Sequence, residues 1–350
     1  MMNTDQSHGF AITGWLGLCC LLLFCMVVLG GVTRLTDSGL SMVRWEPVSG
    51  VLPPLNQAAW QVEFDHYRQF PEYQKINAGM SLDRFKTIFY FEYAHRLLGR
   101  VIGLVFAAGF AWLWFRKRLP YSLKPHFVAM FVLGGMQGLL GWYMVKSGLV
   151  DLPHVSQYRL TAHLGLAILI YLYMLWVVFM LLERRSAPAV SRGLHRASIG
   201  LGILAFVTVL SGGFVAGLKA GHAFNTFPLM AGQWVPPGYL ALEPVWRNFF
   251  ENIANVQFNH RLLAVTTFIL VLVFVLQVIR NKALANLRLP ALVLIGAVMV
   301  QVALGISTLL WHVPLVLAAT HQAVALGLLS VMLYVVFRFR RPEVRGLRQE

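Results

Sequence analysis

Four histidines inside apolar stretches are the residues of this sequence best suited to chemistry. His95 and His260 each begin the tetrapeptide His-Arg-Leu-Leu at the start of a long apolar run. His163 and His321 each lie near the start of another such run. A lone histidine in an apolar helix is more often a packed, hydrogen-bonded residue than a ligand, but four at matched positions indicate a shared use. Because two imidazoles on facing helices can hold a heme iron from both sides, the sequence predicts two heme sites, one for each pair of histidines.

Glu92 distinguishes the first pair of histidines from the second. It lies three residues before His95, so a helix places both side chains on one face about one turn apart. The same position before His260 is occupied by Gln257. An ionisable group at the edge of an apolar span indicates function, and proton transfer needs a group that titrates. We therefore expect the first pair to be the reactive site and the second to hold an electron-transfer or structural heme. The alternative is that Glu92 merely favours the positive end of its helix.

Arg96 and Arg261 directly follow the first histidine of each pair. Arginine binds carboxylates bidentately, so both suit the carboxylate side arms of a porphyrin; the alternative is that they snorkel to the membrane interface. Three further histidines at outward loops or span ends are weaker candidates for the side arms: His154, His222 and His312. Zinc needs three or four converging ligands, and copper tends to bring cysteine or methionine. Histidine pairs on separate helices, with glycines nearby to leave room for a flat ligand, fit heme better.

The composition indicates an all-α membrane protein. Of the 350 residues, 58% are hydrophobic and 12% are charged, which no ordinary soluble domain matches. A helix needs about twenty apolar residues to cross the hydrocarbon core. We predict eight membrane-spanning helices, at residues 11–33, 91–115, 125–146, 158–182, 195–217, 256–279, 289–311 and 314–337. The formal net charge of +15 does not indicate nucleic-acid binding, because the charges lie between the spans.

The charge distribution predicts how the chain is oriented in the membrane. Basic residues crowd the connections after the second, fourth, sixth and eighth spans, whereas residues 34–90 hold six basic and six acidic residues. By the positive-inside rule, both termini face the cytoplasm and the connections 34–90 and 218–255 face outward. The first span has no basic residue before it and no clear small-residue cleavage site, so we expect a retained helix and not a signal peptide. All three cysteines lie in this span, so we expect them to pack there and form no disulfide framework.

The chain contains an internal repeat. The first span ends in Gly30-Gly31 and the fifth in Gly212-Gly213, and each following loop passes an aromatic residue with proline and then Pro-Pro before the His-Arg-Leu-Leu helix. The stretch from Gln137 to Gly141 resembles that from Gln301 to Gly305. We therefore predict two copies of a four-helix unit. Four spans is an even number, so the copies have parallel topology and a pseudo-twofold axis along the membrane normal.

We place the boundary between these units after residue 185. Residues 1–185 are expected to form an N-terminal four-helix bundle that contains the reactive site and the long outward loop. Residues 186–350 are expected to form a C-terminal bundle that contains the second heme.

Together, five motifs resemble the heme A synthase family over nearly the whole chain. They are Gly31-Val32-Thr33-Arg34-Leu35-Thr36-Asp37-Ser38-Gly39-Leu40-Ser41, Glu92-Tyr93-Ala94-His95-Arg96-Leu97-Leu98-Gly99-Arg100, Leu160-Thr161-Ala162-His163-Leu164-Gly165, Asn259-His260-Arg261 and Thr320-His321-Gln322. Members of this family convert heme O to heme A by oxidising a ring methyl to a formyl group through successive hydroxylations.

The resemblance implies a function for each site. It implies a b-type heme on His260 and His321, the substrate heme O near His95 and His163, and an essential acid at Glu92. It also implies that the product goes to terminal heme–copper oxidases. We therefore expect heme O synthase and oxidase assembly factors as partners, together with membrane lipid, an external electron carrier that the sequence does not identify, and further copies of the chain in a homo-oligomer.

Some members of the family carry a cysteine pair in the first outward loop. Residues 34–90 contain no cysteine, so the chain resembles the members without the pair, and we expect no thiol-based redox step. The absence of an N-terminal segment rich in Arg and Ser favours a bacterial inner membrane over an organelle.

Three other kinds of protein share some of these features. A di-heme electron-transfer protein, such as a quinol-linked cytochrome b, would have the histidine pairs but no use for the difference between Glu92 and Gln257. A transporter commonly has parallel repeats, but it would have broken helices near the midplane, whereas the ionisable and Gly-rich stretches here cluster at the outer ends. A purely structural assembly factor would leave four matched histidines unexplained.

Overall fold

The protein is an assembly of long helices. The computed structural model describes residues 4–44, 49–148, 154–183 and 190–340. Within these ranges, eight helices are long and apolar enough to cross a membrane, which confirms the predicted all-α membrane class. They are α1 (Thr4–Leu35), α4 (Leu82–Phe115), α5 (Lys124–Gly148), α6 (Gln157–Leu182), α7 (Arg192–Gly217), α9 (Ile253–Arg280), α10 (Arg288–Leu310) and α11 (Leu315–Phe339). Three shorter helices lie between them: α2 (Gln57–Tyr67), α3 (Pro71–Lys75) and α8 (Asn248–Glu251).

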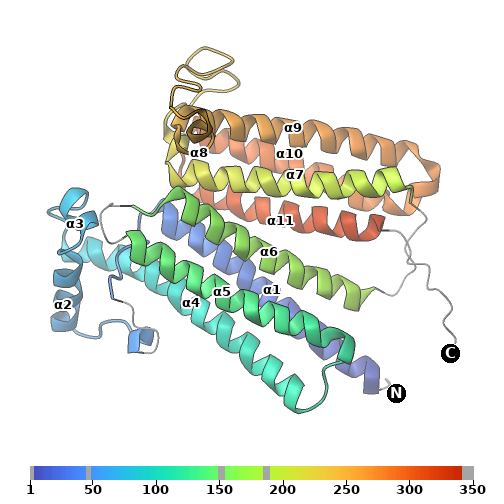
Figure 1. Ribbon diagram of the computed structural model, residues 1–350, viewed down its shortest axis with the longest axis horizontal. Coiled ribbons are helices and arrows are strands. Elements are labelled where there is room, and N and C mark those ends of the chain that lie inside the picture. The colour runs from blue at the N-terminus through green and yellow to red at the C-terminus, as the bar shows by residue number, and fades with distance from the viewer. Residues whose placement is uncertain (1–3, 45–48, 149–153, 184–189, 341–350) are drawn as a thin grey trace.

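The long helices lie in two groups (Figure 1). One group contains α1, α4, α5 and α6, and the other contains α7, α9, α10 and α11. Helix α11 packs against α1 and α6 of the first group, and α7 also packs against α6, so these four helices form the contact between the groups. The grouping is the one that the predicted duplication requires, although the duplication itself stays a prediction. The predicted boundary at residues 185 and 186 lies outside the described residues.

The histidine-bearing helices lie diagonally within each group. Helices α4 and α6 each pack against both α1 and α5, and helices α9 and α11 each pack against both α7 and α10. In a ring of four helices, two that share both neighbours face each other across the centre. Side chains from α4 and α6, or from α9 and α11, can therefore point at one another across the middle of their group.

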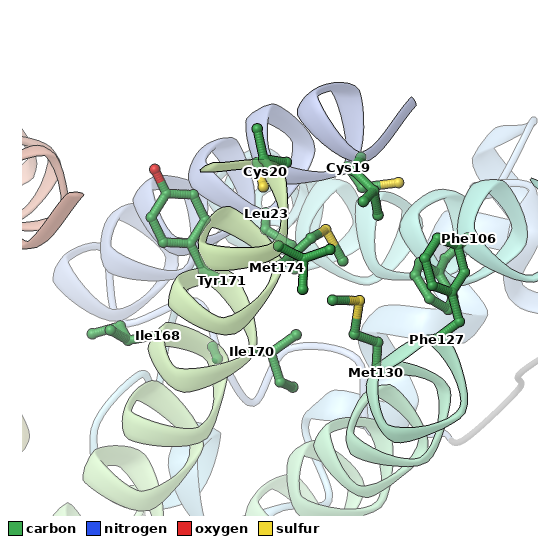
Figure 2. Close-up of a cluster of buried hydrophobic side chains, with 14 of the residues drawn as sticks. Cys19, Cys20, Leu23, Phe106, Phe127, Met130, Ile168, Ile170, Tyr171 and Met174 are labelled. Carbon is green, nitrogen blue, oxygen red and sulfur yellow. The ribbon is translucent and has the colours of Figure 1, made fainter. Parts of the chain in front are cut away.

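A continuous apolar core holds the first group together. Figure 2 shows part of it, with side chains from α1, α4, α5 and α6, including the buried residues Cys19 and Cys20. The free thiols of these two cysteines are packing groups, as expected from the sequence, whereas Cys25 is exposed and the expectation was wrong for it. Trp15 stacks on Phe106 with ring centroids 5.3 Å apart, and a Cβ on Gly109 would lie 2.4 Å from the Trp15 ring. Helices in lipid associate mainly by such close packing, because lipid tails are as apolar as the side chains.

The outward segment 34–90, predicted as a loop, is largely helical. It contains α2, α3 and the first two turns of α4, which begins at Leu82, nine residues before the predicted start at Phe91. Ser81 caps this helix by accepting a hydrogen bond from the backbone N–H of Arg84. The three helices enclose a small aromatic core made of Trp60, Phe64, Tyr67, Phe85, Ile88 and Phe89. The prediction was wrong because the charged residues near Leu82 interrupt the apolar pattern, while the tertiary packing of this core extends the helix.

Arg34 joins the two groups at the ends of α1 and α7. Its guanidinium donates hydrogen bonds to the carbonyls of Ala216 and Gly217 at the end of α7, at 2.8 and 3.2 Å. Asp37 pairs with Arg34 at 2.9 Å and with Lys219 at 2.8 Å. A cation at a helix C-terminus satisfies carbonyls that have no partner within the helix. These contacts fix the end of α1 against the end of α7.

Candidate functional site

In the first group, each histidine lies with the edge of its ring against a glycine of a neighbouring helix. A Cβ on Gly30 in α1 would lie 3.0 Å from Cε1 of His95 in α4. A Cβ on Gly141 in α5 would lie 2.9 Å from Cε1 of His163 in α6. Real Cβ atoms rarely approach another heavy atom this closely, so both rings occupy space that only a glycine leaves free.

The second group repeats the arrangement. A Cβ on Gly212 in α7 would lie 3.2 Å from Cε1 of His260 in α9, and one on Gly305 in α10 would lie 2.9 Å from Cε1 of His321 in α11. From the sequence we expected nearby glycines to leave room for a flat ligand. The structure shows that these four glycines leave room for the imidazole rings themselves, and so fix where each ring lies.

The two histidines of each pair lie on helices that share both neighbours, so their side chains can point at each other across the centre of the group. All four side chains are half-buried. Three of them lie near the outer start of their helix, as expected, but His95 is thirteen residues from the start of α4, because that helix extends beyond the predicted span.

The ring nitrogens fit a role as axial ligands of heme iron. The Nδ1 atoms of His95, His163 and His321 are buried and have no hydrogen-bond partner among the described residues. The Nδ1 atom of His260 lies 2.7 Å from the hydroxyl of Ser211. A hydrogen bond to one imidazole nitrogen fixes the tautomer and leaves the other nitrogen available to a metal. Ser211 is therefore suited to orient His260.

Two glutamines stand beside the second histidine of each pair, and we did not anticipate this from the sequence. Gln137 Nε2 lies 3.4 Å from His163 Nε2 and donates a hydrogen bond to the His163 carbonyl at 3.1 Å. Gln301 Nε2 lies 3.4 Å from His321 Nε2. Each glutamine precedes its ring-contacting glycine by four residues, in the stretches noted as similar in the two halves. The similarity of these two stretches was a sequence signal for the glutamines. We did not use it, because close packing of small residues was sufficient to explain the similarity.

Glu92 is held by three donors in a buried position. Its side chain is 3% exposed; one oxygen accepts hydrogen bonds from the Ser41 hydroxyl at 2.7 Å and the Met42 N–H at 2.8 Å, and the other pairs with Arg96. Three donors, one of them a cation, thus compensate for the burial of this carboxyl. The residue lies ten positions after the start of α4 at Leu82, roughly 15 Å along the axis. The alternative that it serves the positive end of the helix is therefore wrong, since that effect is confined to the first turn.

Gln257 occupies the same position in the second group with opposite hydrogen bonding. It is also 3% exposed, and its amide donates to the carbonyl of Phe224 at 2.9 Å. Arg261 donates to the same carbonyl at 2.9 Å and to that of Thr226 at 2.7 Å. In the first group the carboxylate of Glu92 instead accepts a backbone N–H. Each side chain thus fits the loop backbone of its own group: Glu92 accepts from an N–H, and Gln257 donates to a carbonyl. The exchange of Glu for Gln also removes a titratable group.

The two arginines anchor the outward segments to the histidine helices. Arg96 donates to the carbonyls of Met42 at 2.8 Å and Arg44 at 3.3 Å, in parallel with the contacts of Arg261. In Arg261 the Nε atom is buried and has no hydrogen-bond partner in the described part of the chain, so one donor is available to a ligand. Binding of porphyrin carboxylates by these arginines stays a prediction.

Other metal arrangements have less support. Among the described residues, no group of three or more His, Cys, Asp or Glu side chains could hold a metal ion. Zinc sites need such a group, whereas a heme iron needs only two axial ligands. The side chains of His154, His222 and His312 are exposed at the outer ends of the helices.

Glu72 is a second buried carboxyl near the site that we did not single out from the sequence. Its side chain is 6% exposed and accepts a hydrogen bond from the hydroxyl of Tyr67 at 3.0 Å, and Asn77 donates to that hydroxyl at 2.8 Å. Burial raises the pKa of Glu72 to about 8, and the negative charges of Glu92 and Asp37 add to the rise. Burial also raises the pKa of Tyr67. The residue escaped notice because helix α3 lies in a segment predicted as a loop.

The fold defines a multi-pass helical membrane protein in which each of four histidines lies against a glycine of a neighbouring helix. Residues 13–333 match the COX15-CtaA family, described as cytochrome oxidase assembly protein, and the chain belongs to this family. It is 54% identical to the heme A synthase of Nitrosospira multiformis over 344 residues, which cover 97% of each chain. It is 48% identical to the heme A synthase of Nitrosomonas eutropha over 94% of each chain, and 44% identical to the heme A synthase COX15 of Mus musculus over 95% of this chain and 82% of that protein.

The contact between glycine and imidazole predicts a specific cost for adding a methyl group. In Gly305→Ala the new Cβ would lie 2.9 Å from His321, so the ring must move. Overpacking of this kind costs about 1–3 kcal/mol, and we expect a lower melting temperature for the purified protein. Gly296→Ala is the matched control, because it lies on the same helix with nothing within 4 Å of the added Cβ. Equal melting temperatures for the two variants would contradict the tight contact.

Proposed function

We propose that the chain is a heme A synthase that oxidises a ring methyl of heme O to a formyl group by successive hydroxylations. The observation that carries the proposal is that His95 and His163 lie on diagonal helices of one group, each against a glycine, with the buried carboxyl of Glu92 one helical turn from His95. Relatives that align over nearly the full chain bear the name heme A synthase, which supports the same reaction here.

In this proposal the two groups of helices bind different hemes. In the first group, residues 1–185, His95 and His163 bind the iron of heme O and so place the ring near Glu92. In the second group, residues 186–350, His260 and His321 hold a b-type heme, which when bound supplies one-electron transfer. The matched contacts with Gly30, Gly141, Gly212 and Gly305 support a porphyrin in each group, because all four rings are positioned in the same way.

Glu92 holds or moves a proton beside the reacting methyl group. Oxidation of a methyl to an aldehyde removes electrons, which the external electron carrier must accept, and releases protons, which a base next to the reacting edge can take up. Arg96, Ser41 and Met42 hold the Glu92 carboxyl in place for that role. The Ser41 hydroxyl, 2.7 Å from the carboxylate, can pass it on.

The same proposal bears on the partners of the protein and its location in the cell. The family description, cytochrome oxidase assembly, supports delivery of the product to a terminal oxidase. Heme O synthase, assembly factors, an external electron carrier and a homo-oligomer stay predictions. We place the chain in a bacterial inner membrane with both termini in the cytoplasm, on the basis of the basic connections.

The proposed role of Glu92 predicts a separation of binding from reaction. Glu92→Gln is expected to keep bound heme and to lose formyl-heme formation by at least about a hundredfold, the contribution typical of a general acid or base. The measurement is mass analysis of hemes extracted after expression with a supply of heme O. Asp83→Asn, which removes an exposed carboxylate from the same helix, serves as the control and should still form product. Unchanged product in Glu92→Gln would remove this residue from the reaction. Only b-type heme in the unmodified protein, with quinol oxidation, would instead favour a di-heme electron-transfer protein.

The division between the groups predicts which histidines hold the resident heme. When the protein is expressed without heme O, His321→Ala is expected to abolish the spectrum of a heme with two histidine ligands, and His163→Ala to leave it. Electron paramagnetic resonance and optical spectra of the purified variants provide the measurement. Loss of this heme in His163→Ala but not in His321→Ala would reverse the assignment of the two groups.

The orientation can be checked with reporter fusions. Alkaline phosphatase inserted after Gly232, in the outward connection, is expected to be active, because that enzyme folds only outside the cytoplasm. The same reporter placed after Arg280, in a basic connection, should be inactive. Activity in the opposite pattern would invert the orientation inferred from the charges.

A further inference from the structure

Gln322 directly follows His321 on α11, but its side chain contacts the other group of helices. Its amide nitrogen donates a hydrogen bond to the carbonyl of Val27 on α1, at 2.7 Å. A Cβ on Gly31, one turn further along α1, would lie 2.6 Å from Cδ of Gln322. The amide therefore occupies space that only a glycine leaves free. The function proposed so far gives this side chain no role.

The two adjacent glycines of α1 have partners in different groups. Gly30 lies against the His95 ring of its own group, and Gly31 lies against Gln322 of the other group. One turn beyond Gly30, Arg34 fixes the end of α1 to the end of α7 by its hydrogen bonds to two carbonyls. This part of α1 is thus held by both groups, and it offers Gln322 a firm support.

Helix α11 is likewise held from two directions. His321 lies against Gly305 on α10, and Gln322 lies against Gly31 on α1. Successive residues of an α-helix point about 100° apart around its axis. One contact alone would let α11 roll about its axis, whereas two contacts in different directions prevent rolling. Because helices in lipid associate mainly by close packing and interhelical hydrogen bonds, these contacts decide how α11 is rotated and where the His321 ring points.

A continuous series of contacts therefore joins one histidine of each pair. It begins at the His95 ring, passes through Gly30 and Gly31 on α1, and reaches Gln322 and His321 on α11. The two helices pack directly against each other, although they belong to different groups. A displacement of α1 at this level must therefore also displace α11 next to its histidine.

The corresponding contact between α6 and α7 is apolar in character. Gly213 on α7 follows Gly212, the glycine that lies against His260, and a Cβ on Gly213 would lie 2.9 Å from the hydroxyl oxygen of Thr161 on α6. That hydroxyl is buried and has no hydrogen-bond partner in the part of the chain that the structure describes. Thr161 thus links its helix to the other group by packing, whereas Gln322 adds a hydrogen bond.

We infer that Gln322 is a positioning residue that couples the two histidine pairs. By holding α11 against α1, it makes the direction of the His321 ring depend on the segment of α1 against which the His95 ring lies. Contacts that orient a histidine ligand change the properties of the metal that it binds. The spectroscopic test of the inference therefore rests on the proposed function, in which His321 holds a heme iron.

The contact between α1 and α11 can be tested without any heme measurement. Gly31→Ala pushes the Gln322 amide out of its place and so breaks the hydrogen bond to Val27, which Gln322→Ala also breaks. Because this bond can be lost only once, the melting temperature of the double variant should fall by less than the sum of the two single falls. The measurement uses the full-length protein in lipid nanodiscs.

Gly17→Ala is the control for this experiment, because it lies on the same helix with nothing within 4 Å of the added Cβ. Its effect on the melting temperature should add to that of Gln322→Ala. Additive effects of Gly31→Ala and Gln322→Ala would show that the two residues do not act on each other, and would overturn the inference.

The effect on His321 is measured on protein that is expressed without heme O and carries only its resident heme. Gln322→Met keeps the length of the side chain and loses the amide, so we expect a shift in the largest g value of the ferric heme in electron paramagnetic resonance spectra. Gly31→Ala should also shift this value, although it changes a residue of the other group. In a protein that already carries Gln322→Ala, Gly31→Ala should add no further shift.

Gln277→Met makes the same chemical change at an exposed position of α9 and should leave the g value as it is in the unmodified protein. An unchanged g value in either Gln322→Met or Gly31→Ala would overturn the inference.

Failure of the proposed function would give a different result. If the resident heme spectrum survived His321→Ala, the assignment of this heme to the second group would be wrong, while non-additive melting temperatures would still establish the link between α1 and α11. A protein that shows the shifts in g value but forms no heme A would contradict the proposed reaction and leave the coupling in place.

Discussion

The close contact between an imidazole edge and a glycine on the next helix is the constraint on which the site depends. In lipid, helices gain little from hiding apolar surface and associate through packing, so a missing side chain on one helix decides where a ring on another can lie. This contact occurs for His95, His163, His260 and His321, each time with a different pair of helices. The diagonal arrangement places the two helices that carry these rings across the centre of each group from one another.

The outward segments are attached to this framework by a second repeated device. Arg96 and Arg261, each one residue after a positioned histidine, donate to backbone carbonyls of the segment above. Beside each arginine lies a buried Glu or Gln that contacts the same stretch of backbone. The two groups thus share a geometry and differ in charge. Shared geometry suits the binding of similar flat ligands in both, and the difference in charge suits reaction at only one of them.

The aromatic core over the first group gives Glu92 surroundings that the second group lacks. Helices α2 and α3 fold onto the start of α4, and Tyr67 and Glu72 are buried between them.

The sequence by itself determined the class of the fold, the number of spanning helices and the four histidines, because apolar runs of bilayer length and residues placed in register are local properties of the chain. It also drew attention to Glu92 through the contrast with Gln257. Only the tertiary structure decided which atoms these residues contact. The glycine behind each ring and the Ser41 and Met42 donors to Glu92 come from segments distant in the chain. Helix α4 was cut short in the prediction because its first turns are polar and are stabilised by packing with α2 and α3, an effect that no local pattern records.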